Sequence, residues 1–154
     1  MKFRNTAIAI LAAGVVVMGG SPAHAARDQQ VTGSGIVELV EAGGSARVSV
    51  AERVDPEADE TTATGQVQIL LDSGESVHGT VTCLTIRGQR VTIVGTLDHP
   101  IDGNGFFRVG VVDRAEDSAP DLGSLVLLPD EPTCARPLIG GEVTSGNFTV
   151  KGNG

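Results

Sequence analysis

Apolar and polar residues alternate with a period of two through much of this chain, in short runs. Ala46, Val48 and Val50 are separated by single polar residues. Val67 and Ile69 are separated in the same way. Because successive side chains of a β-strand point to opposite faces, this pattern predicts strands with one buried and one polar face. Such runs, each followed by turn residues, predict strands at residues 31–40, 45–54, 65–71, 76–87, 90–97, 106–112, 124–128 and 138–150.

The spacing of these runs predicts an all-β fold. Connections this short, without helical periodicity, favour an antiparallel meander of about eight strands. We expect a closed or partly open barrel, and a two-sheet sandwich is the alternative. Gly88-Gln89 is expected to form a two-residue hairpin turn, and Gly79 is expected to mark a β-bulge.

The N-terminus has the pattern of a secretory signal peptide. Lys2 and Arg4 precede an apolar run at residues 7–18, which is too short to span a bilayer. Small residues at Ala23 and Ala25 predict cleavage before Ala26. The expected organisation is therefore a signal peptide at residues 1–25 and one secreted domain at residues 26–154. We expect this domain outside the cell or at the cell envelope, with no transmembrane span.

Charge and aromatic content exclude several kinds of partner. The whole chain carries a formal charge of −8, and loss of Lys2 and Arg4 makes the mature domain more acidic. Phosphate binding needs clustered Lys and Arg, so nucleic acid and anionic membrane surfaces are not expected partners. The chain has no Trp and no Tyr. Aromatic sugar-binding platforms and interface hot spots are therefore not expected, and we expect a monomer.

The two cysteines, Cys83 and Cys134, predict one disulfide in an exported chain. The bridge would close a loop of about 50 residues, which the chain-entropy model values at about 4 kcal/mol. A metal site and reactive thiols are the alternatives. A metal site needs three or four ligands, and no further ligands lie near either cysteine in the sequence.

One acidic loop is a candidate calcium site. Ca²⁺ takes six to eight oxygen ligands from such loops, although the spacing here departs from the EF-hand pattern. The alternative is a charged hairpin loop that keeps one end of the sheet soluble. The candidate ligands are Asp113, Glu116, Asp117 and Asp121. No other cofactor is expected.

Two further groups of residues are of types that can bind metal ions or act in catalysis. Asp98, Asp102 and Asn104 resemble a small cation site, but Asp-Gly-Asn-Gly is also ordinary turn sequence. His78 and His99 would need carboxylate help to bind a metal. Adjacent Asp and His do not orient one another as a hydrolytic triad requires, and no G-x-S-x-G elbow is present. No catalytic residues are therefore predicted.

Residues 65–150 carry a set of features in a fixed order: a strand ending in a short turn, a strand carrying a glycine, and a strand ending in Asp. The features lie at residues 77–86 with Gly88, at 91–95, at 109–113 and at Gly140-Gly141. In this order the chain resembles a group of small secreted β-modules common in actinobacteria. The resemblance implies an extracellular all-β fold and implies no catalytic residues.

These observations together predict a secreted, non-enzymatic β-domain with a binding or structural role. Its partner is expected to be extracellular. One alternative is a carrier that holds a small molecule inside the barrel. Another is a hydrolase or a protease inhibitor. An inhibitor would present residues 129–137 as an exposed loop braced by the disulfide.

Overall fold

The structure is a computed structural model that describes residues 29–54, 63–138 and 140–151. The expected signal peptide, with Ala23, Ala25 and Ala26, lies outside the described residues. The described part of the chain is all-β apart from one short 3₁₀-helix, η1 (Ala115–Asp117). None of its helices is long and apolar enough to cross a membrane. The strands are β1 (Gln30–Leu39), β2 (Ser45–Val54), β3 (Ala63–Leu71), β4 (Ser76–Arg87), β5 (Arg90–Ile101), β6 (Asn104–Val112), β7 (Leu122–Leu128), β8 (Gly141–Glu142) and β9 (Gly146–Lys151).

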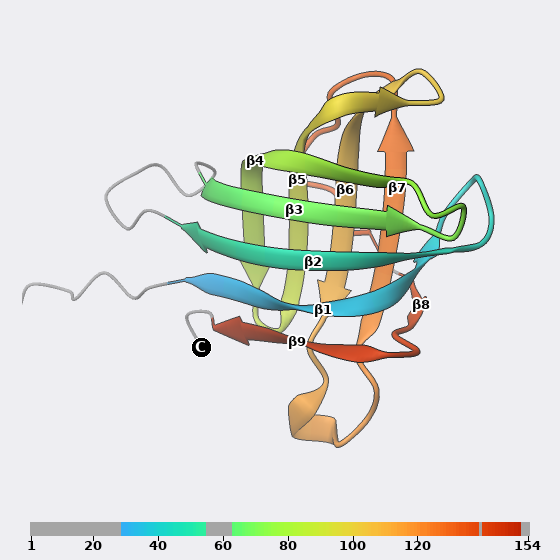
Figure 1. Ribbon diagram of the computed structural model, residues 1–154. Coiled ribbons are helices and arrows are strands. Elements are labelled where there is room, and N and C mark those ends of the chain that lie inside the picture. Colours follow the sequence, from blue (N-terminus) through green and yellow to red (C-terminus); the bar gives the residue numbers. More distant parts are fainter. Residues whose placement is uncertain (1–28, 55–62, 139, 152–154) are drawn as a thin grey trace, which may run out of the picture.

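Strands β1 to β7 form a meander that closes into a barrel. Each strand pairs antiparallel with the next, and β1 then pairs with β7 in parallel. The parallel contact joins Glu38 to Ser124 and Leu39 to Leu125. Strand β9 adds to β1, and β8 adds to β7. The predicted barrel is confirmed, but its closure is parallel, whereas the sequence predicted antiparallel pairing throughout. In Figure 1, β9, β1, β2 and β3 cross in front of β5, β6 and β7.

The C-terminal strand was predicted wrongly. Residues 138–150 form two strands on different partners, because the chain turns between β8 and β9 and bonds to β1 there. The amide of Ile36 donates to the carbonyl of Ser145, at 2.8 Å. The predicted bulge also shifts, from Gly79 to the interval between Val81 and Cys83. In Figure 1, β4 bends from the front group of strands to the back group.

The barrel interior is occupied by apolar side chains. Inward-facing residues of the strands form one continuous buried cluster, whose largest members include Phe107 and Phe148. The ring of Phe107 lies where Gly79 and Gly95 have no side chains. A methyl group at Gly95 would lie 2.6 Å from Cζ of Phe107. These two glycines therefore leave the space that the largest interior ring needs.

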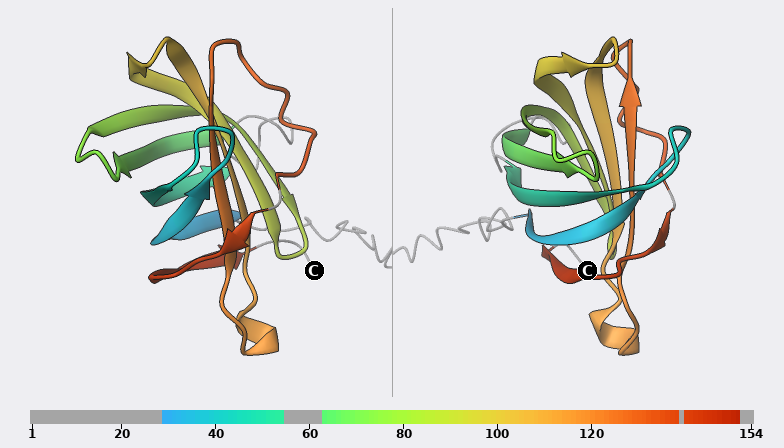
Figure 2. Two further views of the ribbon diagram at one scale, coloured as in Figure 1. Left: turned by 90° about the vertical axis from the view of Figure 1, so that its right-hand side faces the viewer. Right: turned by 45° about the vertical axis from the view of Figure 1, so that its right-hand side comes forward.

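The outer face of the barrel carries a strap, defined as residues 129–138, the described connection leading from β7 towards β8. The predicted disulfide is confirmed: Cys134 of the strap is bonded to Cys83 of β4, with a Cα–Cα distance of 6.0 Å. Leu138 packs over Gly110 of β6, where a methyl group would lie 2.8 Å from the Leu138 Cβ. Figure 2 shows the strap outside the wall of strands. The disulfide thus holds the strap across the outside of the barrel.

Replacing Gly95 with Ala should destabilise the fold by roughly 1–3 kcal/mol, because the methyl group would clash with the backbone carbonyl of Thr80 and with the ring of Phe107. Gly105→Ala is the matched control, since nothing lies within 4 Å of a Cβ at Gly105. Urea unfolding would measure both. Equal midpoints for the two variants would contradict this role of Gly95.

Candidate functional site

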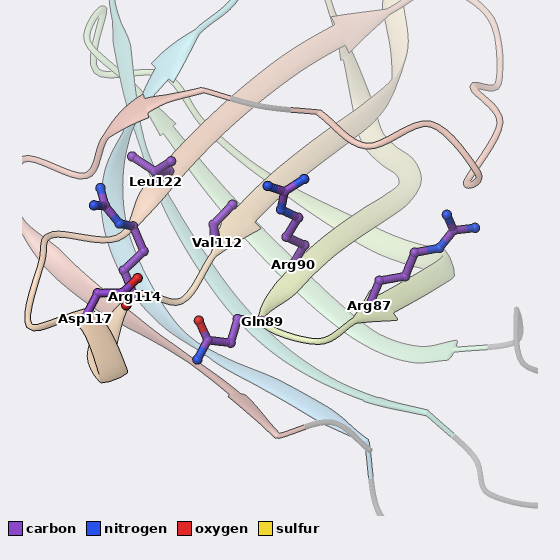
Figure 3. A pocket seen from close by; sticks show the side chains of 7 residues that line it. All are labelled: Arg87, Gln89, Arg90, Val112, Arg114, Asp117 and Leu122. Atoms are coloured by element: carbon purple, nitrogen blue, oxygen red, sulfur yellow. The ribbon is translucent and has the colours of Figure 1, made fainter. Parts of the chain in front are cut away.

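A pocket of about 460 Å³ lies on the outer face, at the end of the barrel where β4 turns into β5. We call it the arginine pocket, because three arginines surround it (Figure 3). Its lining residues are Arg87, Gln89, Arg90, Val112, Arg114, Asp117 and Leu122.

Strand register explains why these residues meet. Arg87 pairs with Arg90 across the Gly88-Gln89 turn, which forms as predicted. Arg90 pairs with Val112 of β6, and Val112 pairs with Leu122 of β7. Paired residues lie on the same face of a sheet, so these four side chains form one row across β4, β5, β6 and β7. Val112 and Leu122 are half-buried and give the pocket apolar surface.

The loop between β6 and β7 brings Arg114 and Asp117 to this row. The amide of Arg114 donates to Oδ1 of Asp121, at 3.0 Å. The amide of Asp113 donates to the carbonyl of Gln89, at 3.0 Å, and so ties the loop to the β4–β5 turn. These two bonds join the loop to the β4–β5 turn and to Asp121, which directly precedes β7.

The pocket has three arginines and one carboxylate, that of Asp117, in its lining. Within the described residues, none of the guanidinium groups of Arg87, Arg90 and Arg114 forms an ion pair or hydrogen bond. Like charges directly opposite one another destabilise a sheet pair, and Arg87 lies directly opposite Arg90. An anion bound between the guanidinium groups would relieve this repulsion and accept their hydrogen bonds.

Two neighbouring pockets share these arginines. The strap pocket, of about 190 Å³, is lined by Arg87 and Arg90 and by residues of β4, β5 and the strap, which are Thr85, Thr92, Cys134, Ala135 and Pro137. A pocket of about 520 Å³ between Gln29 and Thr133 also contains Arg87. Arg87 therefore lies where all three depressions meet.

The candidate calcium ligands have a different arrangement from the one expected. In the described part of the chain, no group of three or more His, Cys, Asp or Glu side chains is placed to hold a metal ion. Asp113 and Asp121 are buried and accept backbone hydrogen bonds instead. Oδ2 of Asp121 accepts from the amide of Phe148 at 2.8 Å, and Oδ2 of Asp113 accepts from that of Val150 at 2.9 Å. Glu116 is exposed, and Asp117 lines the arginine pocket.

The other candidate residues remain near one another without forming a metal site. His78 and His99 are exposed and line a depression of about 190 Å³ that also includes Asp98. Asp102 is the first residue of the Asp-Gly turn that joins β5 to β6. Asn104 begins β6, opposite Ile101. Asp102 and Asn104 are therefore explained as ordinary residues of a hairpin turn.

A buried carboxyl group, that of Glu52, lies inside the barrel wall. Glu52 continues the inward alternation of β2 and is 1% exposed. Its carboxyl lies over Gly65 of β3, where a methyl group would come within 2.6 Å of Cδ. Neither carboxyl oxygen has a hydrogen-bond partner among the described residues. Burial raises the pKa of Glu52 to about 7.

Part of the arrangement of Glu52 and of the arginine pocket can be predicted from the sequence. Extending the alternation beyond Val50 places Glu52 on the inward face, and residues flanking a two-residue turn, such as Arg87 and Arg90, must pair across strands. The sequence does not predict that Arg114 lines the same pocket as Arg87 and Arg90, because this depends on contacts between distant segments.

Asp121→Asn should lower the free energy of unfolding by about 2 kcal/mol, because one of two buried backbone donors loses its charged acceptor. Glu116→Gln is the control: this exposed residue of the same loop makes no hydrogen bond or ion pair within the described residues. Amide hydrogen exchange at Phe148 should accelerate in Asp121→Asn only. Unchanged protection at Phe148 would contradict the role of this carboxylate.

The stability of the protein should depend on pH through Glu52. In the unfolded chain Glu52 ionises near pH 4.5, whereas in the folded chain it stays protonated up to about pH 7. The free energy of unfolding should therefore fall, by roughly 3 kcal/mol, as the pH rises from about 4.5 to 7. Glu52→Gln should remove this component, so the difference between wild type and variant measures it. A difference that does not change with pH would refute the assignment.

Comparison with protein families, with curated proteins and with solved structures finds no match to this chain. The expected resemblance to small secreted bacterial modules therefore stays a prediction, and function is argued from the site.

Proposed function

We propose that this protein is a secreted, non-enzymatic binding module that recognises an anionic ligand in the arginine pocket. The observation that carries the proposal is the set of three arginines around one pocket, without ion pairs in the described structure. The chain as a whole is acidic, so this local concentration of positive charge opposes its overall composition. Guanidinium groups bind carboxylate, sulfate and phosphate through paired hydrogen bonds.

Other features support extracellular binding on the outside of the barrel. The Cys83–Cys134 disulfide suits an oxidising compartment, as does the expected signal peptide. Apolar side chains occupy the barrel interior, which favours an external site over the carrier alternative. The strap is bonded to Cys83 and packed over Gly110, and it borders the pockets, which favours a supporting role for it over the inhibitor alternative.

A single small anion should bind weakly. Arg87 and Arg90 are exposed, and exposed ion pairs contribute only about 0.2–1 kcal/mol each. We therefore expect sulfate to bind with a dissociation constant in the millimolar range, on the order of 1–10 mM. The side-chain Nε–H resonances of Arg87, Arg90 and Arg114 should shift saturably in an NMR titration with sulfate.

Arg90→Gln should weaken sulfate binding at least threefold, because Arg90 lies centrally in the row. Arg47→Gln is the matched control, since Arg47 is an exposed arginine on β2, away from the pocket. Equal effects of the two substitutions, or uniform shifts of all arginine resonances, would overturn the proposed site.

A further inference from the structure

We propose that the ligand is an acidic oligosaccharide, a short chain of sugar units bearing carboxylates, lying along the outer face from Arg114 to the strap. This inference rests on the proposed function, because it uses the same arginines. It adds the chemical class of the ligand and its direction across the barrel.

The connection between the pockets indicates an extended ligand. Arg87 and Arg90 line both the arginine pocket and the strap pocket. A ligand that reaches from Arg114 past Arg90 to Cys134 can contact both pockets without leaving these two side chains. Because each ion pair is exposed and weak, several linked contacts are needed for useful affinity.

Neutral hydrogen-bonding groups lie between the charges. Gln89 lines the arginine pocket, and Thr92, which is 5% exposed, lines the strap pocket at its base. Neither side chain makes a hydrogen bond or ion pair within the described residues. The carboxylate of Asp117 also lines the arginine pocket, and it can accept hydrogen bonds from hydroxyls. Spaced anionic groups separated by hydroxyls, as in a chain of sugar acids, match this alternation.

Charge density distinguishes this ligand from a dense polyanion. Polyphosphate would place a negative charge beside Asp117 and approach a chain with a formal charge of −8. Both interactions are repulsive. A sugar acid carries one charge per ring, so fewer charges approach Asp117.

The absence of Trp and Tyr from the chain does not oppose this ligand. Aromatic stacking holds neutral sugar faces, whereas carboxylates can be held by guanidinium groups. The half-buried side chains of Val112 and Leu122 give the pocket an apolar surface for the C–H face of one ring.

Calorimetric titration of the disulfide-bonded protein with galacturonic acid, its dimer and its trimer tests the inference. Affinity should rise at least tenfold from monomer to trimer as the second pocket is filled. Neutral maltotriose and linear tripolyphosphate should both bind more weakly than the trimer. Thr92→Val, a substitution of similar volume in the strap pocket, should reduce trimer affinity and leave monomer affinity unchanged. Arg47→Gln serves again as the control.

The outcomes separate this inference from the proposed function. Equal affinity for monomer and trimer would overturn the extended ligand while leaving anion binding intact. Tighter binding of tripolyphosphate than of the trimer would replace the saccharide with a dense polyanion. Failure of sulfate and of every galacturonate to bind would overturn the proposed function itself.

Discussion

Two buried carboxylates hold β9, the strand that extends the closure of the barrel along β1. Strands β1 and β7 pair directly at only two positions, and β9 continues along β1 beyond them. The amides of Phe148 and Val150 in β9 donate to Asp121 and Asp113. Unpaired donors on an edge strand invite pairing with other chains, so these carboxylates both complete the seam and protect the edge.

The same interaction prepares the candidate site. While one oxygen of Asp121 binds β9, the other binds the amide of Arg114. The loop that holds β9 is therefore the loop that presents Arg114 and Asp117 to the pocket. A substitution that opens the seam should also displace one third of the positive charge of the site, which couples stability to binding.

The division between inside and outside follows from side-chain size. Gly79 and Gly95 leave interior space that Phe107 occupies, and Gly110 lets the strap approach the outer face closely. Binding chemistry consequently lies on the outside, along a row that the strand register sets. In that row Arg87 and Arg90 repel each other, and an anionic ligand between them would relieve this repulsion.

Local patterns predicted most of the wall of the barrel. Alternating or apolar runs, each bounded by turn residues, placed the first seven strands, because these signals lie within each strand and its turns. The expectation of export and an even cysteine count predicted the disulfide, which the structure contains. The prediction of one strand at residues 138–150 was wrong because hydrogen bonds to β1, near Ile36, decide where the chain turns. Asp113 and Asp121 resembled metal ligands for the same reason, since their backbone partners lie in β9.

The most direct test of this account is a crystal structure of the protein bound to trigalacturonic acid. The account predicts the ligand along the row between Arg114 and the strap. At least two of its carboxylates should lie within hydrogen-bonding distance of Arg87, Arg90 or Arg114. A ligand bound inside the barrel, or on the outer face of β2 and β3 instead, would contradict it.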